Sequence, residues 1–152
     1  MLVASKGGHF EQAVRFSKAL PPIIERQFVT DQQAEQPQVA VVLKRVVDYD
    51  RKNSTLTKLV RILQVILSAS RLIRKERPEL IVTFGAAFCV PVAVSAKFMG
   101  VEVLHVESWS RISTISNTTK FMRMFRLCKA TAYQYEESPL GKFGDCRYIG
   151  HL

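Results

Sequence analysis

The chain has 152 residues, which is enough for one domain with its own core and too few for two full domains. Hydrophobic residues make up 47% of it and charged residues 23%, as in ordinary globular proteins. Lysine and arginine outnumber aspartate and glutamate by 22 to 13, and this net charge of +9 favours a polyanionic partner: nucleic acid, an anionic membrane surface or a phosphorylated substrate.

Strands and helices are expected to alternate along the chain. Hydrophobic periodicity and Gly/Pro breaks predict strands at 1–5, 26–30, 39–43, 80–84, 101–106, 131–134 and 147–149, and helices at 10–20, from 53 or 54 to 77, at 90–98 and at 120–129. This alternation predicts a single domain over 1–152, an α/β fold with a Rossmann-like, open parallel sheet and helices on both faces.

The longest predicted helix carries a clear apolar repeat. Its expected buried face consists of Leu56, Leu59, Val60, Leu63, Ile66, Leu67 and Ile73. Ile62, Val65 and Leu72 lie off that stripe, so a second surface of the helix is also expected to be covered.

Cysteines and apolar runs restrict the class further. Three widely spaced cysteines favour a reducing compartment over a disulfide framework, and scattered histidines form no metal-ligand cluster, so we expect neither a metal nor a cofactor. No signal peptide is visible in the first ten residues. The longest uncharged run, 80–96, falls short of the roughly 20 residues that a membrane-spanning helix needs, and Gly85 and Pro91 interrupt it. A soluble or peripheral protein is therefore expected.

The first ten residues contain a paired glycine where a strand gives way to a helix. Gly7 and Gly8 allow a sharp turn that brings backbone N–H groups close to a ligand, and a helix N-terminus favours phosphate. Lys6 adds a cation, and His9 adds a side chain that titrates near neutral pH. The alternative is a simple strand-to-helix turn in which His9 only starts the helix.

A second small-residue turn, Gly85-Ala86-Ala87, follows the predicted strand 80–84. Ligands of such sheets sit beyond the carboxyl ends of the strands, where the strand order reverses, and the first strand and strand 80–84 are expected to flank that point. The two turns would then face one another, each at a helix N-terminus. This arrangement predicts a pyrophosphate-type site.

Four blocks, in this order, carry a family resemblance: Ser5-Lys-Gly-Gly-His-Phe10, Arg77-Pro-Glu-Leu-Ile-Val-Thr-Phe-Gly-Ala-Ala87, Val90-Pro-Val-Ala93 and His105-Val-Glu-Ser-Trp-Ser-Arg111. The chain resembles the bacterial exopolysaccharide protein PssD and its eukaryotic relative, the membrane-anchoring subunit of the two-chain UDP-N-acetylglucosamine transferase of dolichol-linked oligosaccharide synthesis. Two departures stand out. The eukaryotic N-terminal anchor is absent, which favours the bacterial branch, and alanine stands where relatives often have a second glycine after Gly85.

The resemblance implies the N-terminal, acceptor-binding half of a MurG-like GT-B glycosyltransferase. A separate PssE-like chain would carry the C-terminal half and the UDP-sugar. The acceptor would be a polyprenyl-pyrophosphate-linked saccharide. His9 resembles the histidine of the glycine loop in such enzymes, a candidate general base, although capping the helix or binding phosphate is the alternative. Gly7 and Gly8 are the expected backbone donors to the acceptor pyrophosphate.

Glu107 directly follows a buried strand. It is either a catalytic carboxylate or a partner of Arg111, and its place at the carboxyl end of a strand favours the site. Ser108 and Arg111 would add a hydroxyl and a cation to the pyrophosphate site. Trp109 would serve as an interface residue, a membrane contact or local packing.

The predicted helix 120–129 combines apolar and basic residues. Phe121, Met124, Phe125 and Cys128 would form one face, bracketed by Lys120, Arg123, Arg126 and Lys129. That pattern suits an interfacial helix on anionic lipid. The alternative is an ordinary amphipathic helix with its apolar face on the sheet.

Together these features predict a subunit of a heteromeric glycosyltransferase in polysaccharide biosynthesis, active with a partner chain and peripheral on the cytoplasmic face of the inner membrane. A non-catalytic membrane adaptor that recruits the catalytic partner is the alternative. The hypothesis of a nucleic-acid-binding module rests on net charge alone, because the sequence has no RNP, KH or helix-turn-helix signature. We therefore expect no nucleic-acid partner.

Overall fold

The computed structural model describes residues 1–30, 42–45 and 55–150. Its strands are β1 (Leu2–Ala4), β2 (Gln27–Thr30), β3 (Val42–Arg45), β4 (Leu80–Phe84), β5 (Glu102–Val106), β6 (Ala130–Tyr133) and β7 (Cys146–Tyr148). Its helices are α1 (Gly8–Ala19), α2 (Thr55–Glu76), α3 (Cys89–Phe98), α4 (Asn117–Met124) and a 3-10 turn, η1 (Pro139–Lys142). The predicted cap of α2 at 53 or 54 lies outside the described residues.

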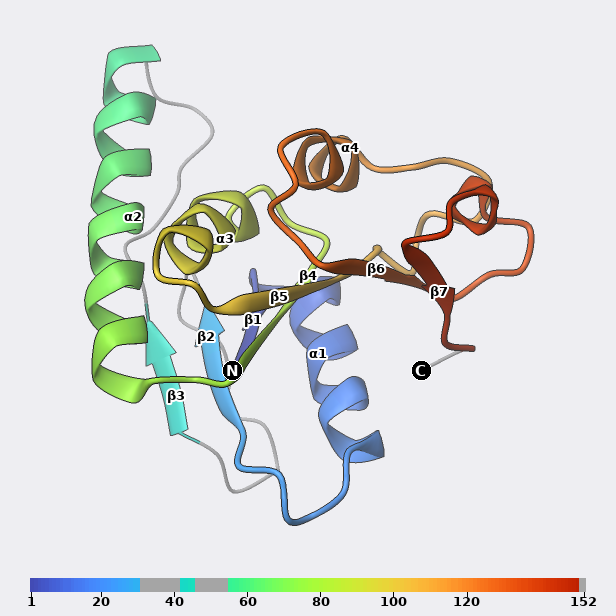
Figure 1. Ribbon diagram of the computed structural model, residues 1–152, viewed down its shortest axis with the longest axis horizontal. Coiled ribbons are helices and arrows are strands. Elements are labelled where there is room, and N and C mark those ends of the chain that lie inside the picture. Colours follow the sequence, from blue (N-terminus) through green and yellow to red (C-terminus); the bar gives the residue numbers. More distant parts are fainter. Residues whose placement is uncertain (31–41, 46–54, 151–152) are drawn as a thin grey trace.

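All seven strands form one parallel sheet in the order β3-β2-β1-β4-β5-β6-β7 (Figure 1). The predicted α/β fold class is therefore confirmed. β3 overlaps the predicted strand 39–43, of which residues 39–41 lie outside the described part of the chain, and its register pairs Gln27 with Val42. Because every strand runs the same way, all carboxyl ends meet at one edge of the sheet, and the connecting loops there can share a site.

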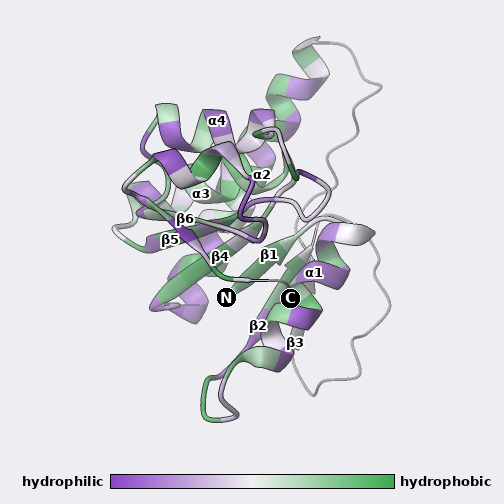
Figure 2. Ribbon diagram, turned by 90° about the vertical axis from the view of Figure 1, so that its right-hand side faces the viewer, coloured by the Kyte–Doolittle hydropathy of each residue, from purple (hydrophilic) through white to green (hydrophobic). Residues whose placement is uncertain are grey.

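Helices cover both faces of the sheet, with α1 on one side and α2, α3 and α4 on the other. β1 illustrates the division, because successive side chains of a strand point to opposite faces. Leu2 and Ala4 pack in the cluster with α1, and Val3 packs in the cluster with α2 and α3. Apolar colouring runs along β1 and β4 in Figure 2, as expected for strands buried on both faces.

The buried face predicted for α2 is wrong for five of its seven residues. Leu56, Leu59, Val60, Leu63 and Leu67 are exposed, and the buried residues are Val65, Ala69 and Ile73. This face packs in one cluster with α3, where Ala69 lies between the larger Val65 and Ile73, and the Ser95 hydroxyl donates to the Ile66 carbonyl at 2.9 Å. Close helix approach through alanine selected this narrower face over the larger leucine stripe.

The helix predicted at 120–129 instead spans Asn117–Met124. It starts early because the Ser116 hydroxyl accepts a hydrogen bond from the Thr119 N–H at 3.1 Å, which is an N-cap. It ends early because Arg126 is left-handed, with φ 49°, and the Leu127 N–H donates to the Met122 carbonyl at 2.8 Å. This is a Schellman ending with arginine in the place usually held by glycine. Cys128 and Lys129 therefore lie beyond the helix.

None of the helices described in the structure is long and apolar enough to cross a membrane.

Candidate functional site

Strand order reverses between β1 and β4, as the sequence predicted. β1 pairs with β2 on one side and with β4 on the other, with Val3 opposite Thr83 and Ala4 opposite Phe84. The turns that follow these two strands meet directly. A Cβ placed on Gly85 would lie 2.4 Å from Cε1 and 2.6 Å from Nδ1 of His9. The structure thus brings the two predicted turns into contact through the His9 ring.

The first turn presents the N-terminus of α1. Gly7 has φ 91°, a conformation that favours glycine, and its carbonyl accepts from the Phe10 and Glu11 N–H groups at 2.9 and 3.1 Å. Gly7 and Gly8 are exposed, and no side chain caps the helix. The first N–H groups of a helix have no partner inside it and attract anions. Lys6, also exposed, precedes this turn.

The second turn is built differently. The Gly85 N–H donates to the Val106 carbonyl at 3.2 Å, and the Ala86 N–H donates to the Phe84 carbonyl at 2.7 Å. Ala86 is buried, Ala87 is half-buried, and α3 begins only at Cys89. Two of the three predicted backbone donors are therefore already used inside the protein. The glycine turn at α1 is the better anion site of the two.

The segment after β5 lies over both turns. Its first residue, Glu107, is buried, and its carboxylate accepts hydrogen bonds from backbone N–H groups. Ser108 is buried, with its hydroxyl 3.0 Å from that of Ser110. Arg111 is exposed and donates to the Thr114 hydroxyl at 3.4 Å. Within the described residues no ion pair joins Arg111 to Glu107, the alternative that the sequence had left open.

Trp109 makes local packing contacts, one of its three predicted roles, and Gln12 contributes a contact that the sequence did not predict. A Cβ on Gly8 would lie 3.3 Å from the indole Nε1 of Trp109, and the Arg15 guanidinium lies 5.0 Å from the centre of the Trp109 ring. Gln12, fully buried, donates from Nε2 to the Glu107 carbonyl at 2.8 Å. The spacing in the sequence could have predicted these contacts, because Gly8, Gln12 and Arg15 follow one another at intervals of four and three residues and so lie along one side of α1.

A buried polar chain runs beneath the site. The Ser116 hydroxyl donates to the Thr119 hydroxyl, which lies 2.8 Å from Nε2 of His105. Nδ1 of His105 lies 2.9 Å from the Thr83 hydroxyl, which donates to the Leu104 carbonyl. With Ser116 as the first donor, this order assigns the imidazole proton to Nδ1. A neutral histidine with both nitrogens bonded locks the segment after β5 to the sheet.

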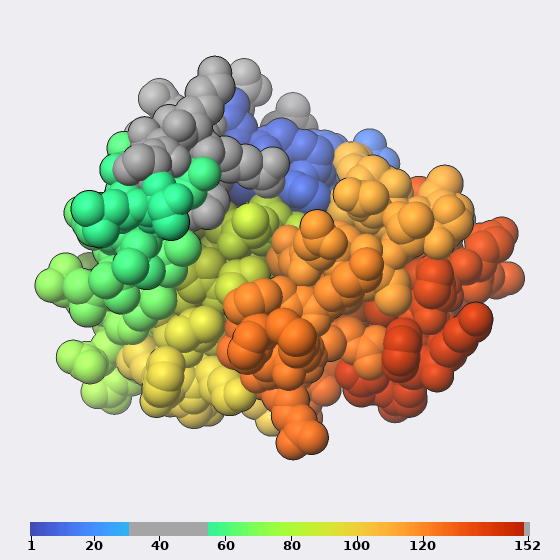
Figure 3. Space-filling model, turned by 90° about the horizontal axis from the view of Figure 1, so that it is seen from above, coloured from blue at the N-terminus to red at the C-terminus, as the bar shows by residue number. Residues whose placement is uncertain are grey.

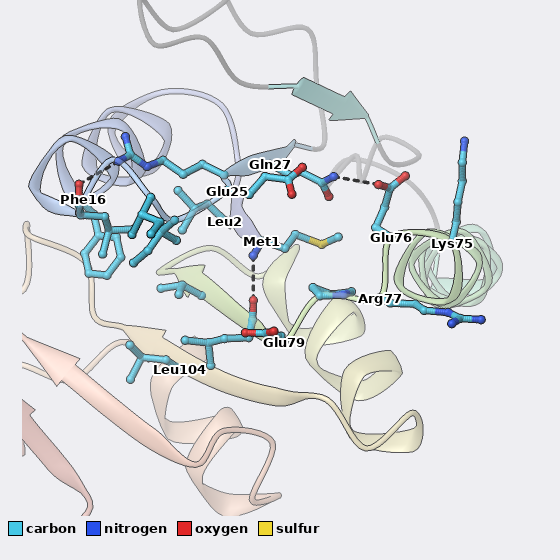
Figure 4. Close-up of a pocket in the computed structure, with 17 residues that line it drawn as sticks. Met1, Leu2, Phe16, Glu25, Gln27, Lys75, Glu76, Arg77, Glu79 and Leu104 are labelled. Carbon is cyan, nitrogen blue, oxygen red and sulfur yellow. Dashed lines mark hydrogen bonds between the residues drawn. The ribbon is translucent and has the colours of Figure 1, made fainter.

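A cavity of about 650 Å³ lies at the opposite edge of the sheet, at the amino ends of the strands. Met1, Phe16, Gln27, Arg77 and Leu80 are among the residues that line it, and the Met1 amino group donates to the Leu80 carbonyl at 2.8 Å (Figure 4). Because ligands of this fold bind at the carboxyl ends, this cavity is separate from the predicted site.

Residues 1–30, 42–45 and 55–150 contain no group of three histidine, cysteine, aspartate or glutamate side chains placed to hold a metal ion. No disulfide joins Cys89, Cys128 or Cys146 in the part of the chain that the structure describes.

Replacing Gly85 by alanine tests the contact between the two turns. The left-handed φ of 57° and the collision with the His9 ring should together destabilise the protein by about 2–5 kcal/mol and displace the imidazole. Gly100→Ala is the matched control, because Gly100 has φ 71° and open space around it, so only the strain of about 1–2 kcal/mol applies. Urea unfolding measures both variants, and equal losses would contradict the packing described above.

The buried imidazole of His105 should make the stability of the protein depend on pH. Burial lowers the pKa of His105 from 6.5 to about 4; nearby Glu107 raises it in part, and His9 lowers it. Between these values the unfolded chain binds more protons than the folded one, so stability falls as the pH falls. From about pH 7 to about pH 5 the loss should be roughly 2 kcal/mol.

Urea unfolding at both pH values measures this loss, and His105→Gln should remove it. NMR supplies a check that needs no variant: the His105 ring signals should remain those of a neutral imidazole at about pH 5. A His105 titration midpoint near 6.5 would contradict the interpretation.

Comparison with known proteins places the chain in a family. The family model described as "Oligosaccharide biosynthesis protein Alg14 like" matches residues 14–152. Among solved structures, MurG of Acinetobacter baumannii superimposes with a TM-score of 0.69 and 15% identity, over 100% of this chain and 43% of that one. UDP-N-acetylglucosamine 2-epimerase of Rickettsia bellii superimposes with a TM-score of 0.60 and 14% identity, over 90% of this chain and 38% of that one. A comparison with curated proteins found no match.

The structural likeness, at these low identities, concerns the fold, and the chain spans less than half the length of either solved structure. It agrees with the predicted Rossmann-like half of a GT-B fold. The family match is independent of the structure and covers nearly the whole sequence. On this evidence the chain belongs to the family of Alg14-like oligosaccharide biosynthesis proteins.

Proposed function

We propose that the chain is the acceptor-binding, membrane-associating subunit of a heteromeric glycosyltransferase. The reaction transfers a sugar from a UDP-sugar to a polyprenyl-pyrophosphate-linked saccharide. The observation that carries the proposal is the exposed Gly7–Gly8 turn at the N-terminus of α1, held against the Gly85 turn at the point where strand order reverses. Backbone N–H groups, a helix dipole and the nearby Lys6 suit a pyrophosphate.

His9 is the proposed general base in this site. Its ring lies between the two turns, so an acceptor pyrophosphate on the glycine turn would bring the attached saccharide near the imidazole. A general base removes the proton of the acceptor hydroxyl as it attacks the anomeric carbon, and UDP leaves with the bonding electrons. The proposal places the UDP-sugar on a partner chain.

Membrane association is supported by two exposed apolar surfaces. The leucine stripe of α2 consists of Leu56, Leu59, Val60, Leu63 and Leu67, and exposed Arg71 and Arg74 follow it along the helix. The second surface consists of Phe121, Met124 and Phe125, with Lys120 and Arg126 exposed beside it. Figure 3 shows the surfaces of α2, α3 and α4 side by side on one side of the molecule. Apolar side chains next to cations suit an anionic lipid surface on the cytoplasmic side of the inner membrane.

Two cations of the predicted membrane set are engaged elsewhere. Lys129 pairs with Glu102, and Arg123 pairs with Asp145 at 2.9 Å while lying over the Phe143 ring. The α2 stripe therefore has a larger part in the proposal than the sequence assigned to it.

Transfer activity tests the proposal. Tagged chain is purified in mild detergent from its native cells with any bound partner, and radiolabelled UDP-N-acetylglucosamine serves as the donor probe with the lipid-linked saccharides of the same cells. His9→Ala should lower transfer by roughly 100- to 10,000-fold with the complex intact, because general base catalysis contributes that much. Lys18→Ala, an exposed change at the far end of α1, is the control. Unchanged transfer by His9→Ala would support the non-catalytic adaptor instead.

Vesicle flotation tests the membrane surface. Leu59→Ser with Leu63→Ser should weaken binding to phosphatidylcholine–phosphatidylglycerol vesicles by about tenfold or more, since each leucine transfers apolar area into lipid. Met124→Ser with Phe125→Ser measures the second surface, and Lys18→Ala is again the control. Unfolding midpoints should barely change, because these side chains are exposed. Full binding by both double variants would rule out these surfaces as the lipid contact.

A further inference from the structure

Glu107 is a buried carboxylate joined to several parts of the fold. Its side chain is 2% exposed. Its N–H donates to the Ala132 carbonyl on β6 at 2.8 Å, and its carbonyl accepts from Gln12 on α1 at 2.8 Å. The backbone of this one residue therefore links the sheet to the helix that carries the glycine turn.

The Glu107 carboxylate joins the two ends of the segment 108–116 through hydrogen bonds. One oxygen, Oε1, accepts from the Ser108 N–H at 2.8 Å, and the other, Oε2, accepts from the Ser116 N–H at 2.9 Å. These donors are the first and last residues of the segment 108–116, so a single side chain holds both of its ends. Hydrogen bonds from N–H groups to a charged carboxylate are stronger than those to a neutral acceptor.

The segment held in this way touches both glycine turns. Trp109 lies against Gly8, where an added Cβ would be 3.3 Å from the indole Nε1. The Cβ of Ser108 lies 3.2 Å from the position that a Cβ on Gly85 would take. The Arg15 guanidinium lies 5.0 Å from the Trp109 ring centre and contacts the indole from the α1 side. The position of the segment therefore limits the space around Gly8 at the start of α1, whereas the surroundings of Gly7 are open.

We infer that Glu107 is a positioning residue: its carboxylate clamps the segment 108–116, which seats Trp109 against Gly8, at the start of α1 and next to Gly7. Paired glycines are otherwise free to sample many backbone conformations, and a turn that binds an anion through N–H groups works best when it is already ordered. Each carboxylate oxygen accepts one backbone N–H, and Glu107 is almost fully buried, so a ligand could reach the carboxylate for proton transfer only if the clamp opened. The clamp itself is a property of the fold, whereas its role in binding the acceptor rests on the proposed function.

Tryptophan fluorescence reads this clamp directly, because Trp109 is the only tryptophan in the chain. Glu107→Ala should shift its emission to the red and increase quenching by acrylamide, as the indole leaves Gly8 and Arg15. Glu107→Gln keeps one carbonyl oxygen as an acceptor and should give an intermediate change. Glu102→Gln is the matched control, the same substitution at an exposed position at the start of the preceding strand, β5. A folded Glu107→Ala protein with wild-type emission and quenching would overturn the inference.

Hydrogen exchange gives a second measurement on the unaltered protein, in case Glu107→Ala does not fold. The N–H groups of Ser108 and Ser116 should be protected as strongly as those of β5. In Glu107→Gln at least one of the two should lose roughly tenfold or more protection, because a hydrogen bond to a charged acceptor contributes that much. Exchange of both amides at the rate of an open loop in the wild-type protein would contradict the clamp.

The transfer assay separates positioning from proton transfer. In the purified complex, Glu107→Gln should change the apparent KM for the lipid-linked acceptor and leave the shape of the pH–rate profile unaltered. Loss of one limb of that profile would assign Glu107 to acid–base chemistry and overturn the inference. Should the wild-type complex transfer no sugar while fluorescence and exchange behave as expected, the proposed function fails and the clamp stands.

Discussion

The parallel pairing of β1 with β4 is the constraint on which the rest of the structure depends. It joins the first residues of the chain to residues some eighty positions later, with Leu2, Val3 and Ala4 opposite Val82, Thr83 and Phe84. Because parallel strands end at the same edge, the turns after them must also meet. The absence of a side chain at Gly85 then leaves room for the His9 ring, so that β-sheet geometry and one missing Cβ define the site together.

Polar burial is the second organising feature. Thr83, His105, Thr119 and Ser116 form a continuous hydrogen-bonded chain, and Glu107 accepts two backbone N–H groups. Buried polar groups are costly unless they are satisfied, and a satisfied network permits few alternative arrangements. The core beneath the site therefore specifies one conformation for the segment that carries Trp109, where apolar packing alone would tolerate several.

The two helices that differ from expectation share a physical cause. α2 has apolar residues on two sides, and periodicity favours the leucine stripe, whereas contact with α3 requires the small Ala69 and its neighbours Val65 and Ile73. α4 ends where Arg126 becomes left-handed so that Leu127 can be buried. In both cases the sequence of the helix allowed more than one buried face or end point, and packing against the rest of the fold decided between them. The result leaves leucine and phenylalanine side chains exposed on two helices that cover the same face of the sheet.

The sequence by itself determined the α/β class, the order of the elements, the glycine turn at α1 and its meeting with the turn after β4. These follow from local periodicity, glycine positions and the rules of parallel sheets. Tertiary structure decided what depends on contacts between distant residues: the buried face of α2, the end of α4, and the roles of Gln12 and Trp109. It also placed the carboxylate of Glu107 on the backbone at both ends of one segment. A sequence gives the identity of a hydrogen-bonding group, but only the folded chain brings its partners within reach.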